Sequence, residues 1–256
     1  MKQRIISGAL IALVTIALIL IGGIPFKLFA LFMAIWGSYE FSSARIKKIN
    51  KFEFYSMLVF TILINIFFNK AIGLVILLMI VLICYTIFDE NETIEDFAVT
   101  FIESLILGFS IHYLIEIEDL SKPLMGFVVL IPYITDVCAY FVGMYFGKRK
   151  LLVRISPKKT IEGALGGWAG GAVISFIYAA LFNFFYMSPL FIALCSLILP
   201  LLSEIGDLVF SLIKRHYNVK DFSDLIKGHG GLLDRLDSLI FVVLIYGALA
   251  SIFGIY

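Results

Sequence analysis

Charged residues are scarce in this 256-residue chain, and its cysteines are few and isolated. Only 15% of the residues are Asp, Glu, Lys or Arg, whereas about 25% is usual for a soluble domain. Cys84, Cys138 and Cys195 lie in apolar stretches and form neither a CxxC pair nor a Cys/His spacing. The sequence therefore predicts no disulfide framework and no zinc site. A net charge of +1 gives no reason to expect a nucleic-acid partner.

Several familiar sequence patterns are also missing. The phosphate-loop pattern GxxxxGK followed by Ser or Thr does not occur. We find no Ser/His/Asp or Cys/His arrangement of the kind that activates a nucleophile, which makes acyl transfer less attractive. The basic start at Lys2 and Arg4, followed by an apolar run, is similar to a signal peptide. No Ala-x-Ala cleavage site follows, so we interpret this run as a retained first span.

What the sequence has in excess is apolar residues, which make up 61% of it. A water-soluble fold of this size could not bury so many, so the bilayer must be the solvent for much of the chain. The period-2 alternation of a transmembrane barrel is absent, and lipid cannot satisfy an open backbone. We therefore predict an all-α polytopic integral membrane protein with about nine transmembrane helices. The apolar segments are residues 5–22, 27–44, 52–69, 71–88, 97–115, 123–146, 161–182, 188–213 and 233–254.

The distribution of Lys and Arg predicts how these segments are oriented. With nine helices and a cytoplasmic N-terminus, all but three of the 20 Lys and Arg residues fall on the cytoplasmic side. The exceptions are Lys27, Lys70 and Lys122. This asymmetry is the one that membrane proteins favour, and one missed helix would scramble every later loop. We expect residues 1–120 to form a scaffold of five helices and residues 121–256 to form four helices that carry the catalytic site.

Polar residues cluster in three places after residue 130, and Asp136 marks the first. It lies well inside an apolar segment, where a carboxylate costs several kcal/mol unless it is paired, hydrated or bound to a metal. A polar contact that packs two helices together is one interpretation. A residue that lines a polar cavity is the interpretation that we favour.

The second cluster is the loop Ser156-Pro157-Lys158-Lys159-Thr160. Two adjacent lysines and two hydroxyl groups just before a span can bind phosphates or anionic lipid headgroups. The alternative is an ordinary basic cytoplasmic loop, which the orientation already predicts. Glycines at positions 163, 166, 167, 170 and 171 follow the loop and favour close packing of helices.

The third cluster consists of carboxylates on the last two apolar segments. Glu204 and Asp207 are three residues apart, as are Asp234 and Asp237, so each pair shares one face of a helix. A short connection between the segments would bring Asp207, Asp234 and Asp237 together, and they would repel one another unless a cation lay between them. Oxygen-only ligation suits Mg²⁺, and a second cation is compatible with it. Solvated charges at the membrane surface are the alternative.

The connection between these two segments holds further polar residues. His229 lies between glycines, where a capping or backbone hydrogen bond is as reasonable as catalysis. Gly230 and Gly231 would allow the backbone to approach a phosphate or to adopt a positive φ. Glu40, near the end of the second segment, is a candidate buried carboxylate whose partner the sequence does not identify, and the roles of Glu40 and Glu204 stay open.

A long pattern of spaced positions covers the last third of the chain. It consists of Ser211, Lys214-Arg215, Lys220-Asp221, Ser223, Ile226, His229-Gly230-Gly231 and Asp234-Arg235-Leu236-Asp237. At these positions the chain resembles the phosphatidate cytidylyltransferase family. The Ser156–Thr160 loop and the segment from Asp136 through Ala139-Tyr140 to Gly143 also look like the family's. One departure is Lys227, where the family has Pro or Gly, and it puts the conformation of the loop before His229 in question.

The resemblance implies that CMP is transferred from CTP to phosphatidic acid, with release of pyrophosphate, in the presence of Mg²⁺. It also implies a bacterial cytoplasmic membrane with the active site facing the cytoplasm, and it leaves the oligomeric state open, a homodimer included. The implied catalytic residues are Asp136, Asp207, Asp234 and Asp237, the last three as metal ligands. The implied substrate-binding residues are Ser156, Lys158, Lys159, Thr160, Lys214, Arg215, Lys220, Asp221, His229, Gly230, Gly231 and Arg235.

Two other functions are compatible with parts of this pattern. Another lipid-phosphate enzyme, such as a polyprenol kinase, could use the same acids and lysines. An ion or phosphate transporter could use intramembrane carboxylates, but inverted repeats are its usual sign and we find none. The CDP-alcohol phosphotransferase motif DGx₂ARx₈Gx₃Dx₃D is absent, which argues against that neighbouring enzyme class.

Overall fold

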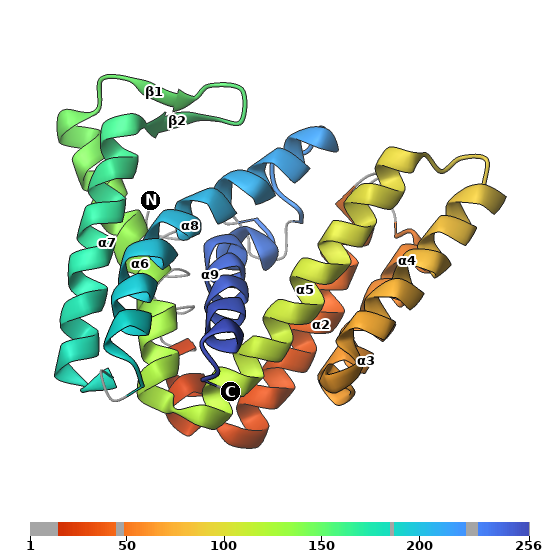
Figure 1. Cartoon of the computed structure of the whole chain (residues 1–256). Helices are drawn as coiled ribbons and strands as arrows, with labels where there is room; N and C mark the ends of the chain where they lie inside the picture. Colours follow the sequence, from red (N-terminus) through yellow and green to blue (C-terminus); the bar gives the residue numbers. More distant parts are fainter. Residues whose placement is uncertain (1–14, 45–48, 185–186, 224–229, 256) are drawn as a thin grey trace. The chain divides into compact units, whose positions relative to one another are not determined.

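The computed structural model describes residues 15–44, 49–184, 187–223 and 230–255 (Figure 1). Helices account for nearly all regular structure in these ranges. The chain forms two compact units, of which the first comprises Met1–Glu116 with His216–Arg235 and the second Ile117–Arg215 with Leu236–Tyr256. The predicted division of the chain at residue 120 stays a prediction, and residues 216–235 group with the first unit.

The first unit contains α2 (Gly23–Ala44), α3 (Lys51–Ile66), the short 3-10 helix η1 (Phe68–Lys70), α4 (Ala71–Phe88) and most of α5 (Ile94–Leu120). Asn50 begins α3, because its side-chain oxygen accepts hydrogen bonds from the first turn of that helix. Phe60 and Ile64 of α3 form a buried cluster with Leu78 and Leu82 of α4, and aromatic side chains of α5 pack against it.

The second unit contains α6 (Lys122–Phe146), β1 (Lys150–Leu152), β2 (Ser156–Thr160), α7 (Ile161–Leu181), α8 (Pro189–His216) and most of α9 (Leu233–Ile252). Helices α6 and α7 lie side by side (Figure 1). Glycines repeat every fourth residue along α7 and let the two backbones approach closely. A Cβ added at Gly163 would lie 2.9 Å from the carbonyl oxygen of Ala139, and one at Gly167 would lie 2.9 Å from that of Thr135.

Gly167→Ala is expected to destabilise the protein by about 1–3 kcal/mol, the usual effect of overpacking. The new methyl group would lie 2.8 Å from the Cβ of Ala139 and would also contact Glu204. Gly73→Ala is the matched control, since it is the same change in a helix where no atom of the described residues lies within 4 Å of the new Cβ. Thermal unfolding in detergent should show a lower midpoint for the first variant only. Equal midpoints would mean that α6 and α7 do not need this glycine.

Within the described ranges, six helical segments are long and apolar enough to cross a membrane. They are Phe68–Phe88, which joins η1 to α4, and helices α5, α6, α7, α8 and α9. The prediction of an α-helical membrane protein is therefore confirmed. The predicted segments 27–44 and 52–69 are helical as α2 and α3, but neither belongs to this set. Most of the first predicted segment lies outside the described residues.

Candidate active site

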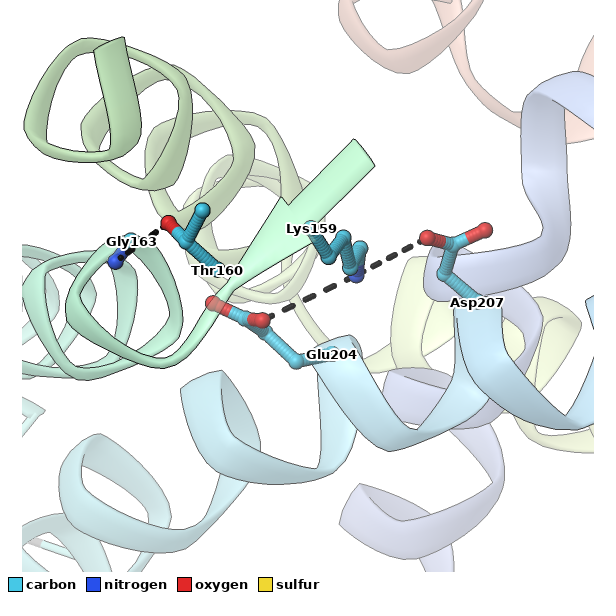
Figure 2. A network of polar contacts seen from close by, with 5 residues as sticks. All are labelled: Lys159, Thr160, Gly163, Glu204 and Asp207. Carbon is cyan, nitrogen blue, oxygen red and sulfur yellow. Dashed lines mark hydrogen bonds and ion pairs between the residues drawn. The ribbon is translucent and has the colours of Figure 1, made fainter. Parts of the chain in front are cut away.

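The loop predicted between the sixth and seventh spans is a β-hairpin, which the sequence pattern does not indicate. Strands β1 and β2 pair antiparallel between α6 and α7 (Figure 1). Glu162, in the first turn of α7, accepts hydrogen bonds through Oε2 from the backbone N–H groups of Lys148 and Arg149 at 3.0 and 3.1 Å. Thr160 caps α7, since its Oγ1 accepts a hydrogen bond from the backbone N–H of Gly163 at 3.1 Å (Figure 2). The hairpin is therefore tied to α7 at both of its ends.

Lys159, on β2, places its ammonium group between two carboxylates of α8 (Figure 2). Its Nζ lies 2.8 Å from Oδ2 of Asp207 and 3.6 Å from Oε2 of Glu204. Burial opposes the charged form of Lys159, but Asp207, Glu204 and Asp136 attract the ammonium group more strongly. The pKa of Lys159 is therefore raised above its ordinary value of 10.5. This lysine is a cation at neutral pH.

The contacts of Lys159 leave part of its hydrogen-bonding capacity unused. Neither Nζ of Lys159 nor either carboxylate oxygen of Glu204 has a well-aligned hydrogen-bond partner among the described residues. An ammonium group carries three donors, and a buried donor without a partner is costly. The Glu204 side chain is only 6% exposed, so water has little access to it. The arrangement can accept an anionic ligand at the lysine only where a further cation offsets the charge of the two carboxylates.

Aspartates of α6, α8 and α9 gather in the same unit. Asp237 interacts electrostatically with three charged residues of this unit. The carboxylates of Asp207 and Asp136 repel its negative charge, and the buried ammonium group of Lys214 attracts it. Helices α8 and α9 touch at Gly206, because a Cβ there would lie 3.4 Å from the carbonyl oxygen of Asp237. The second unit thus combines the carboxylates of Asp136, Asp207 and Asp237 with two lysine cations.

Asp234 belongs to the first unit, where it anchors the chain that precedes α9. Its Oδ2 accepts hydrogen bonds from the backbone N–H groups of Phe222 and Gly231, both at 2.8 Å. Gly230 has a φ of +80°, a conformation that glycine adopts without strain. A Cβ at Gly230 would lie 2.8 Å from the same Asp234 oxygen. One oxygen of this predicted metal ligand is therefore committed to holding the backbone.

The other predicted substrate-binding residues differ in exposure. Ser156 and Thr160 are half-buried, whereas Gly230 and Gly231 are buried. His229 and Lys227 lie outside the described residues. The exposed members of the predicted set are Lys158, Arg215, Lys220, Asp221 and Arg235.

The described residues include no group of three or more His, Cys, Asp or Glu side chains arranged to hold a metal ion. The chemistry of the available donors nevertheless fits Mg²⁺, because Asp136, Asp207 and Asp237 offer only carboxylate oxygens. Mg²⁺ commonly binds to one or two carboxylates and keeps several waters that substrate phosphates can replace. The donor chemistry of these residues therefore fits a hydrated Mg²⁺ ion.

Two carboxylates to which the sequence assigned no role have partners in the structure. Glu204 faces Lys159, as described above. Glu40 accepts four hydrogen bonds within the first unit, two of them from backbone groups at the start of α9. The position of Glu40 within an apolar segment was readable from the sequence. The partner of Glu40 that is most distant in sequence lies 193 residues further along the chain, so the sequence could not show these contacts.

Comparison with known proteins gives a consistent result over nearly the whole chain. The sequence matches the Cytidylyltransferase family over residues 2–253. It is 34% identical over 261 residues to the phosphatidate cytidylyltransferase of Bacillus subtilis (strain 168), an alignment that covers 95% of each chain. It is 32% identical to the phosphatidate cytidylyltransferase of Staphylococcus haemolyticus (strain JCSC1435), covering 95% of this chain and 96% of that one. The chain therefore belongs to the cytidylyltransferase family.

Proposed function

We propose that this protein is a phosphatidate cytidylyltransferase, which transfers CMP from CTP to phosphatidic acid and releases pyrophosphate. Membership of the cytidylyltransferase family supports the reaction class. The structural observation that carries the proposal is the set of ion pairs that Lys159 makes with Glu204 and Asp207. Lys159, partly buried and held 2.8 Å from Asp207, has donors left for a phosphate once a further cation offsets the charge of Asp207 and Glu204.

The reaction requires charge stabilisation more than proton transfer. An oxygen of the phosphatidate phosphate forms a bond to the α-phosphorus of CTP, and the bond from that phosphorus to the bridging oxygen of the β-phosphate breaks. Pyrophosphate leaves with the electron pair of that bond. A phosphate monoester has its second pKa near 6, so the attacking oxygen is already ionised at pH 7 and needs no general base. Lys159 and Lys214 supply positive charge where two anionic phosphates meet.

Mg²⁺ is part of this proposal. Asp207 and Asp237, with Asp136, would hold the ion, and the involvement of Asp234 stays a prediction from the sequence. When bound, Mg²⁺ neutralises charge on the phosphates and on the leaving group. Lys159 and Lys214 would orient the phosphates through hydrogen bonds and ion pairs.

Production of CDP-diacylglycerol by the purified protein tests the proposed function. The protein in detergent should release pyrophosphate from CTP only when phosphatidate and Mg²⁺ are both present. A polyprenol kinase would instead release CDP and would phosphorylate a polyprenol. CDP release, or turnover without phosphatidate, would exclude the cytidylyltransferase activity.

The proposed topology has nine spans, a cytoplasmic N-terminus and an active site at the cytoplasmic face of a bacterial inner membrane. It predicts that the hairpin tip is cytoplasmic, whereas the connection between α5 and α6 lies on the other side. Val153→Cys should react with an impermeant maleimide only after cell lysis, in a chain whose native cysteines are replaced. Leu120→Cys should react in intact cells, and both positions carry exposed side chains. The reverse labelling pattern would overturn the orientation.

A further inference from the structure

A histidine and a glutamate face each other one helical turn apart near the C-terminal end of α5. His112 and Glu116 are four residues apart, so their side chains project from the same face of this helix. Nε2 of His112 lies 3.5 Å from Oε2 of Glu116. Both residues belong to the first unit, and the proposed transfer of CMP uses neither of them.

The distance between these two atoms is too long for a hydrogen bond and matches two ligands of one metal ion. An N–H···O hydrogen bond brings its nitrogen and oxygen to about 2.7–3.2 Å. Two ligands that each lie about 2.0–2.2 Å from a tetrahedral Zn²⁺ ion are about 3.4 Å apart. Nε2 of His112 and Oε2 of Glu116 are both buried, and neither has a hydrogen-bond partner among the described residues. A metal ion between them would satisfy both atoms.

Two aromatic rings hold the imidazole of His112 in place. The ring of Phe68, in η1, stacks on it with 3.8 Å between the ring centroids and an angle of 15° between the planes. Tyr113 lies edge-on to both rings. An imidazole that is already ordered loses little conformational freedom when it binds a metal. The His112 side chain is 14% exposed and that of Glu116 is 32% exposed, so an ion with its waters can reach the pair.

The pair lies near the end of its span and not at the midplane of the bilayer. Helix α5 has 27 residues and is about 40 Å long, whereas the hydrocarbon core of a bilayer is about 30 Å thick. The short helix η1, which supplies the stacked ring of Phe68, also carries the exposed side chains of Asn69 and Lys70. Polar, exposed side chains at this level indicate contact with water. In the proposed topology this is the side opposite the cytoplasm.

We propose that His112 and Glu116 form a binding site for a transition-metal ion, for which Zn²⁺ fits best. Zn²⁺ binds imidazole nitrogen and carboxylate oxygen together, whereas Mg²⁺ prefers oxygen alone. The described residues offer no group of three His, Cys, Asp or Glu side chains, so water or an external ligand completes the tetrahedron. This site is independent of the cytidylyltransferase activity, because its residues all belong to the first unit.

Amide hydrogen exchange in α5 tests the site. Zn²⁺ is added to the purified full-length protein in detergent, without a histidine tag. A metal that joins residues 112 and 116 closes one helical turn and opposes its opening. At a free Zn²⁺ concentration of ten times the Kd, exchange over residues 112–120 should be about tenfold slower. Mg²⁺ at the same concentration should leave exchange there unchanged, because a hard cation gains little from imidazole.

Two variants identify the ligands. Glu116→Gln keeps the size of the side chain and the stacking of Phe68 on His112, but it replaces a carboxylate with a weaker amide ligand. His112→Asn removes the imidazole. Each change should weaken the binding of Zn²⁺ at least tenfold and abolish the local slowing of exchange. His216→Asn is the matched control, since it is the same change at an exposed histidine, and it should leave the effect of Zn²⁺ on α5 intact.

The outcomes separate this site from the proposed function. Exchange over residues 112–120 that does not respond to Zn²⁺ in the wild type would overturn the site. An undiminished response in Glu116→Gln would overturn it too, and this variant decides the question if His112→Asn does not fold. Equal slowing by Mg²⁺ would contradict the assignment to imidazole. The exchange measurement needs no substrate, so an inactive wild-type protein would exclude the cytidylyltransferase activity without affecting the metal site.

Discussion

Asp207→Asn is expected to lower kcat by a factor on the order of 10²–10³, the range seen when one preorganised electrostatic contact is removed from an active site. The change removes the anion that lies 2.8 Å from Lys159 Nζ. It also removes one of the carboxylates proposed for Mg²⁺. Asp207 is partly exposed, at 27% of its side chain, so the loss of charge there should affect stability less than activity. Steady-state turnover of CTP, with thermal unfolding measured alongside, checks both parts.

Asp119→Asn is a suitable control for this variant. It is the same chemical change at an exposed position of the second unit, at the end of α5. It should leave kcat within twofold of the wild type. If Asp207→Asn retained more than half of the wild-type kcat, neither the ion pair nor a cation at Asp207 could be important to the reaction.

The helices were predictable because their signal is local. The apolar runs over residues 71–88 and 123–146 coincide with α4 and α6 to within a residue or two, since hydropathy alone decides which segments lipid accepts. The glycine repeat after residue 160 also predicted close packing, and α7 does lie against α6. The hairpin was not predictable in this way. It forms because Glu162 reaches back to the backbone of Lys148 and Arg149, a contact that has no hydropathy signature.

The candidate site was predictable in its residue types and much less in its pairings. The carboxylates at 207 and 237 were identified from their helical spacing, and both lie in the second unit with Lys159. The spacing also assigned Asp234 to a metal, which stays a prediction, and its Oδ2 accepts hydrogen bonds from two backbone N–H groups that the spacing did not indicate. The contacts of Glu40 and Glu204 depend on tertiary structure, which no periodicity encodes. Buried carboxylates without an obvious partner in the sequence are therefore the positions at which structure adds most.

Lys159→Met is expected to lower both activity and stability. The variant leaves Glu204, whose side chain is 6% exposed, without the ammonium group that lies 3.6 Å from its Oε2, and an unpaired buried charge typically costs about 3–5 kcal/mol. Because the pKa of Lys159 is raised above 10.5, its ion pairs stabilise the wild type fully below pH 10.5 and are lost only as the pH rises through the folded value. The contribution of these ion pairs to the stability of the wild type should therefore be constant between pH 7 and 9, which unfolding of the wild type across that range checks. Lys150→Met, at an exposed position on β1, should change neither property.

The double variant Lys159→Met with Glu204→Gln separates the structural role of this lysine from its role in the reaction. Neutralising Glu204 removes the unpaired buried charge, and replacing a buried ion pair by neutral groups is often close to neutral in stability. The unfolding midpoint should therefore return most of the way to the wild-type value. Turnover should stay about 100-fold low, because the ammonium group that binds phosphate is still missing. Recovery of activity together with stability would show that Lys159 only supports the fold, and the binding of phosphate would then have to be assigned to Lys214 and its neighbours on α8.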